Sequence, residues 1–229
     1  MALNEATGNM FRFITHTWNT IRGECFHKCP YCYMKGIPSG QGATRYDNTA
    51  FRDNLKKNIS IFVGSSNDLF ADNISSEWIQ KTIYYCSGFD NHYLFLTKNP
   101  ARYQEFNFPK QNNLFDQLFA DESKYRFGTT METNRDYNKF MGKAPCTFDR
   151  AAAMPKGEFV SIEPIMDFDL NEFLQIINIC KPEMVEIGAD SKNNGLPEPS
   201  KEKIQQFIYE LQPITKVKMK DNLKRILIK

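Results

Sequence analysis

The sequence lacks the features that mark secreted and membrane proteins. Among its 229 residues, no apolar run approaches the roughly 20 residues that span a bilayer. The first residues, MALNEATGNMF, have no basic stretch followed by an apolar one, as a signal peptide would. We therefore expect a cytoplasmic protein with no membrane association, in a compartment where thiols stay reduced.

Strong charge and repetition are also missing. The formal net charge is only +2, which gives no general argument for a nucleic-acid or membrane partner. No internal repeat, low-complexity segment or long linker divides the chain. Hydrophobic residues make up 41% of the sequence and can build a sizeable core. We expect a single domain over residues 1–229 with a basic C-terminal segment.

Short β-rich runs alternate with helix-like stretches along the chain. The expected strands are FITHTWNTI, ISIFVGSS, YLFLTKN, YRFGTTMET, EFVSIEPI and MVEIGAD, with TKVKMK as a less certain seventh. Helices are expected over residues 75–89, 169–181 and 200–212, where a Ser or Asp can cap each start. Residues 102–108 and 151–154 carry weaker helical patterns.

This alternation predicts a parallel sheet with right-handed crossovers. The chain is short for a complete eight-fold barrel of about 250 residues. We therefore expect an α/β fold, an open, partial (β/α) TIM-like barrel of about six parallel strands. A flat doubly wound sheet is the alternative. In both architectures, chemistry belongs at the C-terminal ends of the strands.

Polar side chains follow the expected strands at those ends. They are Ser65, Ser66 and Asp68, then Thr97 and Lys98, then Thr130, Glu132 and Asn134, then Glu163, and finally Asp190. Any one of them is as readily explained by the polarity of loops. The pair Glu132 and Glu163 is less ordinary, because a carboxylate directly after an apolar strand is less common than Ser, Asn or Gly.

Three cysteines crowd into the eight residues CFHKCPYC, at Cys25, Cys29 and Cys32. The other three cysteines are widely scattered, so they form no second ligand set. A disulfide would leave one of the three unpaired, and a zinc site would need His27 or His16 as its fourth ligand. A cluster held by four cysteines is equally incomplete here. In a cluster held by only these three, one iron would stay open to an exogenous ligand.

The spacing Cys25-x3-Cys29-x2-Cys32, with Tyr31 just before the last cysteine, resembles the signature loop of radical S-adenosylmethionine (SAM) enzymes. The runs FVGSSNDLF, LFLTKNP, FGTTMETNRDY, FVSIEPIMDFDL and EIGADSKNNGLPEPS resemble a small radical SAM family of bacteria, archaea and phages. The resemblance extends from about residue 11 to about residue 226.

The resemblance implies a [4Fe-4S] cluster on the three cysteines, with SAM bound to the open iron. It implies that an electron, from a donor such as flavodoxin or ferredoxin, cleaves SAM to a 5′-deoxyadenosyl radical that takes a hydrogen atom from a substrate. It places SAM near Tyr31, Gly64, Ser65, Ser66, Asp68, Thr130, Glu132, Asn134, Glu163 and Asp190. The acid usual in the superfamily after the second strand is missing, and Asp68 is the candidate to replace it. Catalytic candidates are Glu132, Glu163 and, as a hydrogen-atom donor, Cys146.

The sequence leaves three interpretations of what the protein acts on or binds. A nucleic acid or another macromolecule would suit the basic tail KVKMKDNLKRILIK, which includes Lys224 and Arg225. A small, nucleoside-like metabolite is the second reading. In the third, the protein is a non-catalytic iron–sulfur or zinc module that binds a partner, which the many polar strand ends argue against.

Overall fold

The computed structural model describes residues 2–106 and 122–228. The chain divides into two compact units. The first comprises Met1–Lys28 and Met34–Phe127, and the second comprises Cys29–Tyr33 and Gly128–Lys229. The cysteine loop therefore contributes residues to both units. No helix in the described ranges is long and apolar enough to cross a membrane.

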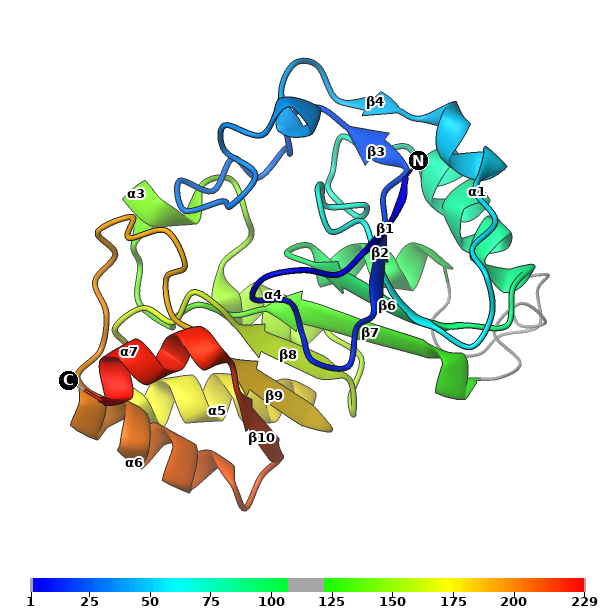
Figure 1. Ribbon diagram of the computed structural model, residues 1–229. Coiled ribbons are helices and arrows are strands. Elements are labelled where there is room, and N and C mark those ends of the chain that lie inside the picture. The colour runs from blue at the N-terminus through cyan, green and yellow to red at the C-terminus, as the bar shows by residue number, and fades with distance from the viewer. Residues whose placement is uncertain (1, 107–121, 229) are drawn as a thin grey trace. The chain divides into compact units, whose positions relative to one another are not determined.

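The strands form an open, mainly parallel sheet, which confirms the expected α/β class and partial barrel. The strand order is β1-β2-β5-β6-β7-β8-β9-β10 (Figure 1). Strand β1 runs antiparallel to β2, whereas the pairs β2·β5, β5·β6, β7·β8, β8·β9 and β9·β10 are parallel. Strands β1 and β10 are the edges, and within the described residues they do not pair with each other to close a barrel. The sheet has eight strands where about six were expected.

The first unit holds the N-terminal part of the sheet. Its strands are β1 (Leu3–Glu5), β2 (His16–Trp18), β5 (Ser60–Val63), β6 (His92–Thr97) and the first half of β7 (Tyr125–Thr130). A separate ribbon pairs β3 (Ile21–Arg22) with β4 (Arg45–Tyr46). Short 3-10 turns lie at Pro38–Gly40, Asn48–Arg52, Pro100–Phe106 and Glu122–Lys124.

Helix α1 (Ser76–Ser87) shows how this unit builds its core. The Ser75 hydroxyl accepts the Trp78 N–H at 3.3 Å and so satisfies one of the open donors at the helix start. Ile79, Ile83 and Cys86 recur at helical spacing and are buried. Burying this one face stabilises a helix that would be marginal alone.

The second unit holds the end of β7 and strands β8 (Phe159–Ile162), β9 (Met184–Ile187) and β10 (Lys216–Met219). Its helices are α3 (Asn138–Met141), α4 (Thr147–Ala153), α5 (Leu170–Cys180), α6 (Lys201–Leu211) and α7 (Lys224–Leu227), with a 3-10 turn at Asp221–Leu223. Figure 1 shows α5 and α6 side by side next to strands β8–β10. Phe168, Phe173 and Phe207 pack with ring centroids 4.7 to 5.3 Å apart and join α5 to α6.

The three main predicted helices are confirmed as α1, α5 and α6. The weaker pattern at 151–154 is the end of α4. The pattern at 102–108 falls on a 3-10 helix as far as Phe106, and its last two residues lie outside the described residues. The first predicted strand is shorter than expected, because the chain leaves the sheet after Trp18 and then pairs with β4 instead.

Candidate functional site

The cysteine loop begins directly after β3, at Gly23. This glycine has φ +88°, and a Cβ at this position would lie 2.2 Å from the carbonyl oxygen of Ala43. Only glycine can make this turn, because any side chain would collide with backbone. Asn67, beyond the end of β5, donates its Nδ2 to the Gly23 carbonyl oxygen at 3.0 Å. The start of the loop is therefore fixed to the C-terminal end of a sheet strand.

The three loop cysteines carry thiols rather than disulfides, as do the other three. Cys29 is buried, and Cys25 and Cys32 are half-buried. Within residues 2–106 and 122–228, no group of three or more His, Cys, Asp or Glu side chains is arranged to hold a single metal ion. The thiolates of a cubane cluster each bind a different iron, so a cluster does not require them to converge on one point.

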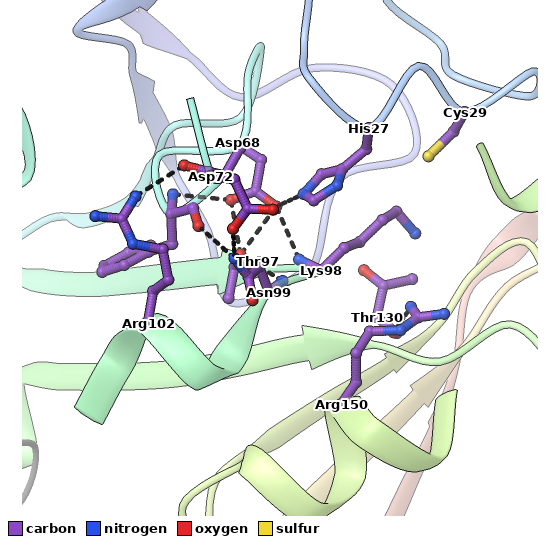
Figure 2. A network of polar contacts seen from close by, with 12 residues as sticks. His27, Cys29, Asp68, Asp72, Thr97, Lys98, Asn99, Arg102, Thr130 and Arg150 are labelled. Atoms are coloured by element: carbon purple, nitrogen blue, oxygen red, sulfur yellow. Dashed lines mark hydrogen bonds and ion pairs between the residues drawn. The ribbon is translucent and has the colours of Figure 1, made fainter. Parts of the chain in front are cut away.

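Asp68, predicted as a cofactor contact, is bound to the cysteine loop through His27 (Figure 2). The His27 ring is 2% exposed, and its Nε2 lies 2.8 Å from Asp68 Oδ2. The same carboxylate accepts the Thr97 hydroxyl at 2.7 Å and the Lys98 N–H at 2.8 Å, both at the end of β6. It also accepts the Phe70 N–H at 2.9 Å.

The charge state of this network follows from its contacts. Burial alone would raise the pKa of the Asp68 carboxyl, but the hydrogen bond and charge of His27, with the Lys98 N–H and Thr97 hydroxyl, lower this pKa below its ordinary value. Asp68 is therefore an ionised acceptor, and the Nε2 atom of His27 carries the proton between them. The Nδ1 atom of His27 is buried with no hydrogen-bond partner among the described residues.

The turn after β5 contains the predicted residues Gly64, Ser65 and Ser66. Gly64 has φ +81°. The Asn19 side-chain oxygen accepts the Ser65 hydroxyl at 3.2 Å and the Ser66 N–H at 2.8 Å, which holds the turn against the end of β2. The Ser66 hydroxyl and the Asn67 Oδ1 are buried and have no hydrogen-bond partner within the described part of the chain. Buried polar atoms of this kind are uncommon and point to a missing ligand or water.

Tyr31 and Glu132 meet in the second unit. The Tyr31 hydroxyl donates to Glu132 Oε1 at 2.5 Å, and Arg150 Nη2 lies 2.8 Å from Glu132 Oε2. Both charged side chains are fully buried. The Thr130 carbonyl oxygen accepts a second bond from the Arg150 guanidinium. Glu132 thus lies in an internal ion pair that also holds a loop side chain.

The ionisation of this triad is set by burial and by the pair itself. Burial raises the pKa of the Tyr31 phenol well above its ordinary value, and the Glu132 charge raises it further. Burial alone would lower the pKa of Arg150, but the charge of Glu132 raises it above its ordinary value. The phenol stays protonated and the guanidinium stays charged, as both hydrogen bonds require.

Asn134, in the loop after β7, contacts the residues at the start of α5. Its Nδ2 donates to Glu172 at 2.9 Å, and its Oδ1 accepts the Asp169 N–H at 2.9 Å. Asp169 is the N-cap residue of α5, but its carboxylate binds Arg135 instead of the helix backbone. The side-chain amide of Asn134 therefore holds the first turn of α5 and its N-cap residue in place.

Glu163 follows β8 and binds two side chains from the region after β10. Its Oε2 lies 2.6 Å from Lys220 Nζ, and its Oε1 accepts Asn222 Nδ2 at 2.8 Å. The Lys220 side chain is only 5% exposed. A Cβ at Gly188 would lie 2.7 Å from Glu163 Oε1, so the carboxylate occupies the space that glycine leaves. These residues form a carboxylate–ammonium pair at the C-terminal ends of two strands.

The last two predicted residues have local roles. Asp190 is buried, and its carboxylate accepts the Lys192 N–H at 3.1 Å and Asn194 Nδ2 at 2.6 Å, which shapes the loop after β9. Cys146 is exposed and is the N-cap residue of α4, with its sulfur 3.4 Å from the Asp149 N–H. Neither contact tests the predicted cofactor or hydrogen-donor role, and both stay predictions.

Carboxylates engage much of the basic C-terminal segment. Lys220 pairs with Glu163, Lys224 with Asp221 at 2.9 Å, and Arg225 with Glu198. Their positive charge is partly neutralised within the chain, which weakens the case for this segment as a phosphate-binding tract.

Sequence reasoning missed three side chains on which these clusters depend. Arg150 lies in the run DRAAAM, and its burial against Glu132 leaves no local pattern there. Asn19 and Asn222 have no signal either, because nothing local distinguishes them from loop asparagines. For His27 the sequence suggests only a zinc-ligand role and gives no signal of its bond to Asp68.

The residues present fit an iron–sulfur cluster with SAM. Three soft thiols lie within eight residues. The buried, unpartnered atoms of His27, Ser66 and Asn67 lie on the cysteine loop or on the turn after β5. Hydrogen-bonding atoms left in this state are suited to a polar ligand.

The chain matches no protein-family model and no curated protein sequence. It is similar to solved structures of spore photoproduct lyase variants. One matches with a TM-score of 0.62 and 14% identity over 93% of this chain and 79% of that chain. A second, with bound AdoMet (SAM) and dinucleoside spore photoproduct, matches with a TM-score of 0.60 and 13% identity over 92% and 78%. A third, with dinucleoside spore photoproduct, has a TM-score of 0.61 and 14% identity. The likeness at this identity is one of fold, and it covers nearly the whole of this chain.

Proposed function

We propose that the protein is a radical SAM enzyme in which Cys25, Cys29 and Cys32 hold a [4Fe-4S] cluster. The observation that carries the proposal is a set of three closely spaced thiols, with no fourth nearby in sequence, on a fold shared with a protein that binds AdoMet. When bound, the cluster and SAM would supply the electron transfer and the radical chemistry. The protein's own residues would bind and orient the cluster, SAM and the substrate, and they would exclude water from the site.

The residues at the strand ends have distinct parts in this proposal. The Ser66 hydroxyl and Asn67 Oδ1 supply hydrogen-bonding capacity that the described residues leave unused. Glu163 and Lys220 form an ion pair at the ends of β8 and β10, and a zwitterionic ligand would have to exchange partners with both charges. Tyr31 stays protonated against Glu132 and so holds its place in the loop.

For the substrate, we favour a nucleic acid or a nucleoside-like molecule. The support is that two of the similar structures hold a dinucleoside. The physiological electron donor would be a small redox protein such as flavodoxin or ferredoxin. Binding to an oligonucleotide should weaken as salt rises, because phosphate contacts release counterions. Binding that does not respond to salt would favour the small molecule.

The test is anaerobic reconstitution followed by iron, sulfide and SAM assays. The wild-type protein should bind about four irons and four sulfides, the composition of the cluster, and release 5′-deoxyadenosine from SAM after reduction. Cys29→Ala should lose both properties, whereas Cys180→Ala, which removes a buried thiol outside the cysteine loop, should keep them. Zinc in place of iron, or a cluster that never cleaves SAM, would support a non-catalytic metal module instead.

A further inference from the structure

The cysteine loop is held by one side chain in each interval between its cysteines, the first buried and the second half-buried. His27 lies between Cys25 and Cys29, and Tyr31 lies between Cys29 and Cys32. His27 bonds to the carboxylate of Asp68, and Tyr31 bonds to the carboxylate of Glu132. Both carboxylates follow strands of the sheet, where the sequence alone suggested contacts to SAM.

The Asp68 carboxylate has no acceptor capacity left for such a contact. An ionised carboxylate offers about four lone-pair positions. Asp68 receives four donors, from His27 Nε2, the Thr97 hydroxyl and the N–H groups of Phe70 and Lys98, at 2.7 to 2.9 Å (Figure 2). The ammonium group of a ligand would have to displace one of them.

Glu132 is engaged by fewer groups, one hydrogen bond and one ion pair. Its side chain is fully buried, one oxygen accepts the Tyr31 hydroxyl, and the other faces Arg150. Arg150 is itself fully buried and bonded to the Thr130 carbonyl. In these surroundings the Glu132 carboxylate contacts the Tyr31 side chain of the loop and is not exposed to solvent.

We propose that Asp68 and Glu132 are positioning residues, which hold the cysteine loop through His27 and Tyr31 in the conformation that binds the cluster, and are not ligands of SAM. The inference rests on the proposed function, because it requires the cluster. One carboxylate holds the first interval of the loop within the first unit, and the other holds the second interval within the second unit. Mutation of residues that hold metal ligands in this way commonly lowers metal affinity by about 10- to 100-fold.

The experiment removes the hydrogen bonds without removing the carboxylates. Tyr31→Phe deletes one hydroxyl and leaves the Glu132–Arg150 pair intact, so the buried carboxylate keeps its ion-pair partner. His27→Leu deletes the bond to Asp68, and His27→Gln retains a side-chain N–H that can restore it. Tyr84→Phe is the matched control, because this tyrosine is 63% exposed on α1.

The reconstituted proteins are compared without SAM, by the rate of iron loss to a chelator and by the electron paramagnetic resonance spectrum of the reduced cluster. Tyr31→Phe and His27→Leu should lose iron about 10- to 100-fold faster than wild type, with an altered spectrum. His27→Gln should recover part of the difference, and Tyr84→Phe should match wild type. SAM binding is then measured on cluster-loaded Asp68→Asn.

The outcomes separate this inference from the proposed function. A wild-type protein that takes up no cluster refutes the proposed function and, with it, this inference. A wild-type cluster together with wild-type iron loss and spectra in Tyr31→Phe and His27→Leu overturns the positioning role alone. Loss of SAM binding in an Asp68→Asn protein whose cluster is unchanged also overturns it, since Asp68 would then be a SAM ligand. If His27→Leu does not fold, Tyr31→Phe decides the question.

Discussion

Replacing Glu132 with glutamine should destabilise the protein strongly, because it leaves the buried Arg150 charge without its partner. Glu132 and Arg150 are both 0% exposed, and their charged atoms are 2.8 Å apart. Removing one member of a buried pair typically costs about 3–5 kcal/mol, because the remaining charge stays buried without compensation. Total stability of a domain is commonly about 5–15 kcal/mol, so this is a large fraction of it.

The assay is thermal unfolding followed by circular dichroism. For chains of this length, each kcal/mol shifts the midpoint by about 2–4 °C, so Glu132→Gln should lower it by roughly 6–20 °C. Asp221→Asn is the control, since its pair with Lys224 is about 60% exposed and should contribute less than about 1 kcal/mol.

A double variant separates the charge from the packing. Arg150→Met removes the buried charge that Glu132→Gln leaves without a partner. Replacing both members of a buried ion pair is often close to neutral for stability. The double variant should therefore be more stable than Glu132→Gln alone. A midpoint for Glu132→Gln within about 2 °C of wild type would refute the assignment of a buried, dry ion pair.

Three further outcomes are expected. Burial raises the pKa of the Cys180 thiol to about 11, so iodoacetamide at pH 8 should modify exposed Cys146 and spare Cys180, as mass spectrometry would show. Gly188→Ala should push the Glu163 carboxylate aside and raise the acetylation of Lys220 by acetic anhydride. The pKa of Asp68 is lowered on folding, so its contribution to stability is present above its ordinary value of 3.8 and is lost as pH falls through the lower folded pKa. Asp68→Asn should remove that part of the acid dependence of unfolding.

Each of these has a contradicting result and a control. Equal alkylation of Cys146 and Cys180 in the folded protein would contradict the burial of the Cys180 thiol on α5. Gly88→Ala, where a Cβ would meet only a carbonyl oxygen at 3.5 Å, should leave lysine acetylation unchanged, and an equal increase there would refute the steric argument. Asp90→Asn, at an exposed pair with Lys124, should change the acid slope less than Asp68→Asn does, because solvent screens exposed pairs. An unchanged slope in Asp68→Asn would contradict the predicted linkage.

The central strands could be located from the sequence, because each is a short apolar run that ends at polar residues. Strands β5 to β9 fall within or close to their predicted runs. Strand β1, with the sequence LNE, could not be found in this way. Its Leu3 N–H is held by Asp53 at 2.7 Å, and it pairs with β2. These contacts are distant in sequence and leave no local pattern.

A cluster on the cysteine loop could be proposed from the spacing of its cysteines, but the partners of the strand-end carboxylates could not be predicted. Asp68 and Glu132 look alike in the sequence, since each follows an apolar strand. What distinguishes their roles is the pairing of Asp68 with His27, 41 residues away, and of Glu132 with Tyr31, 101 residues away. The residues that could bind them were visible, but only the fold decides which ones do.

The release of 5′-deoxyadenosine from SAM by the reconstituted, reduced protein tests the central claim most directly. The proposal predicts release by wild type and by Cys180→Ala, and none by Cys29→Ala. A wild-type protein that holds a complete, reducible four-iron cluster and binds SAM, yet releases no 5′-deoxyadenosine, would contradict it.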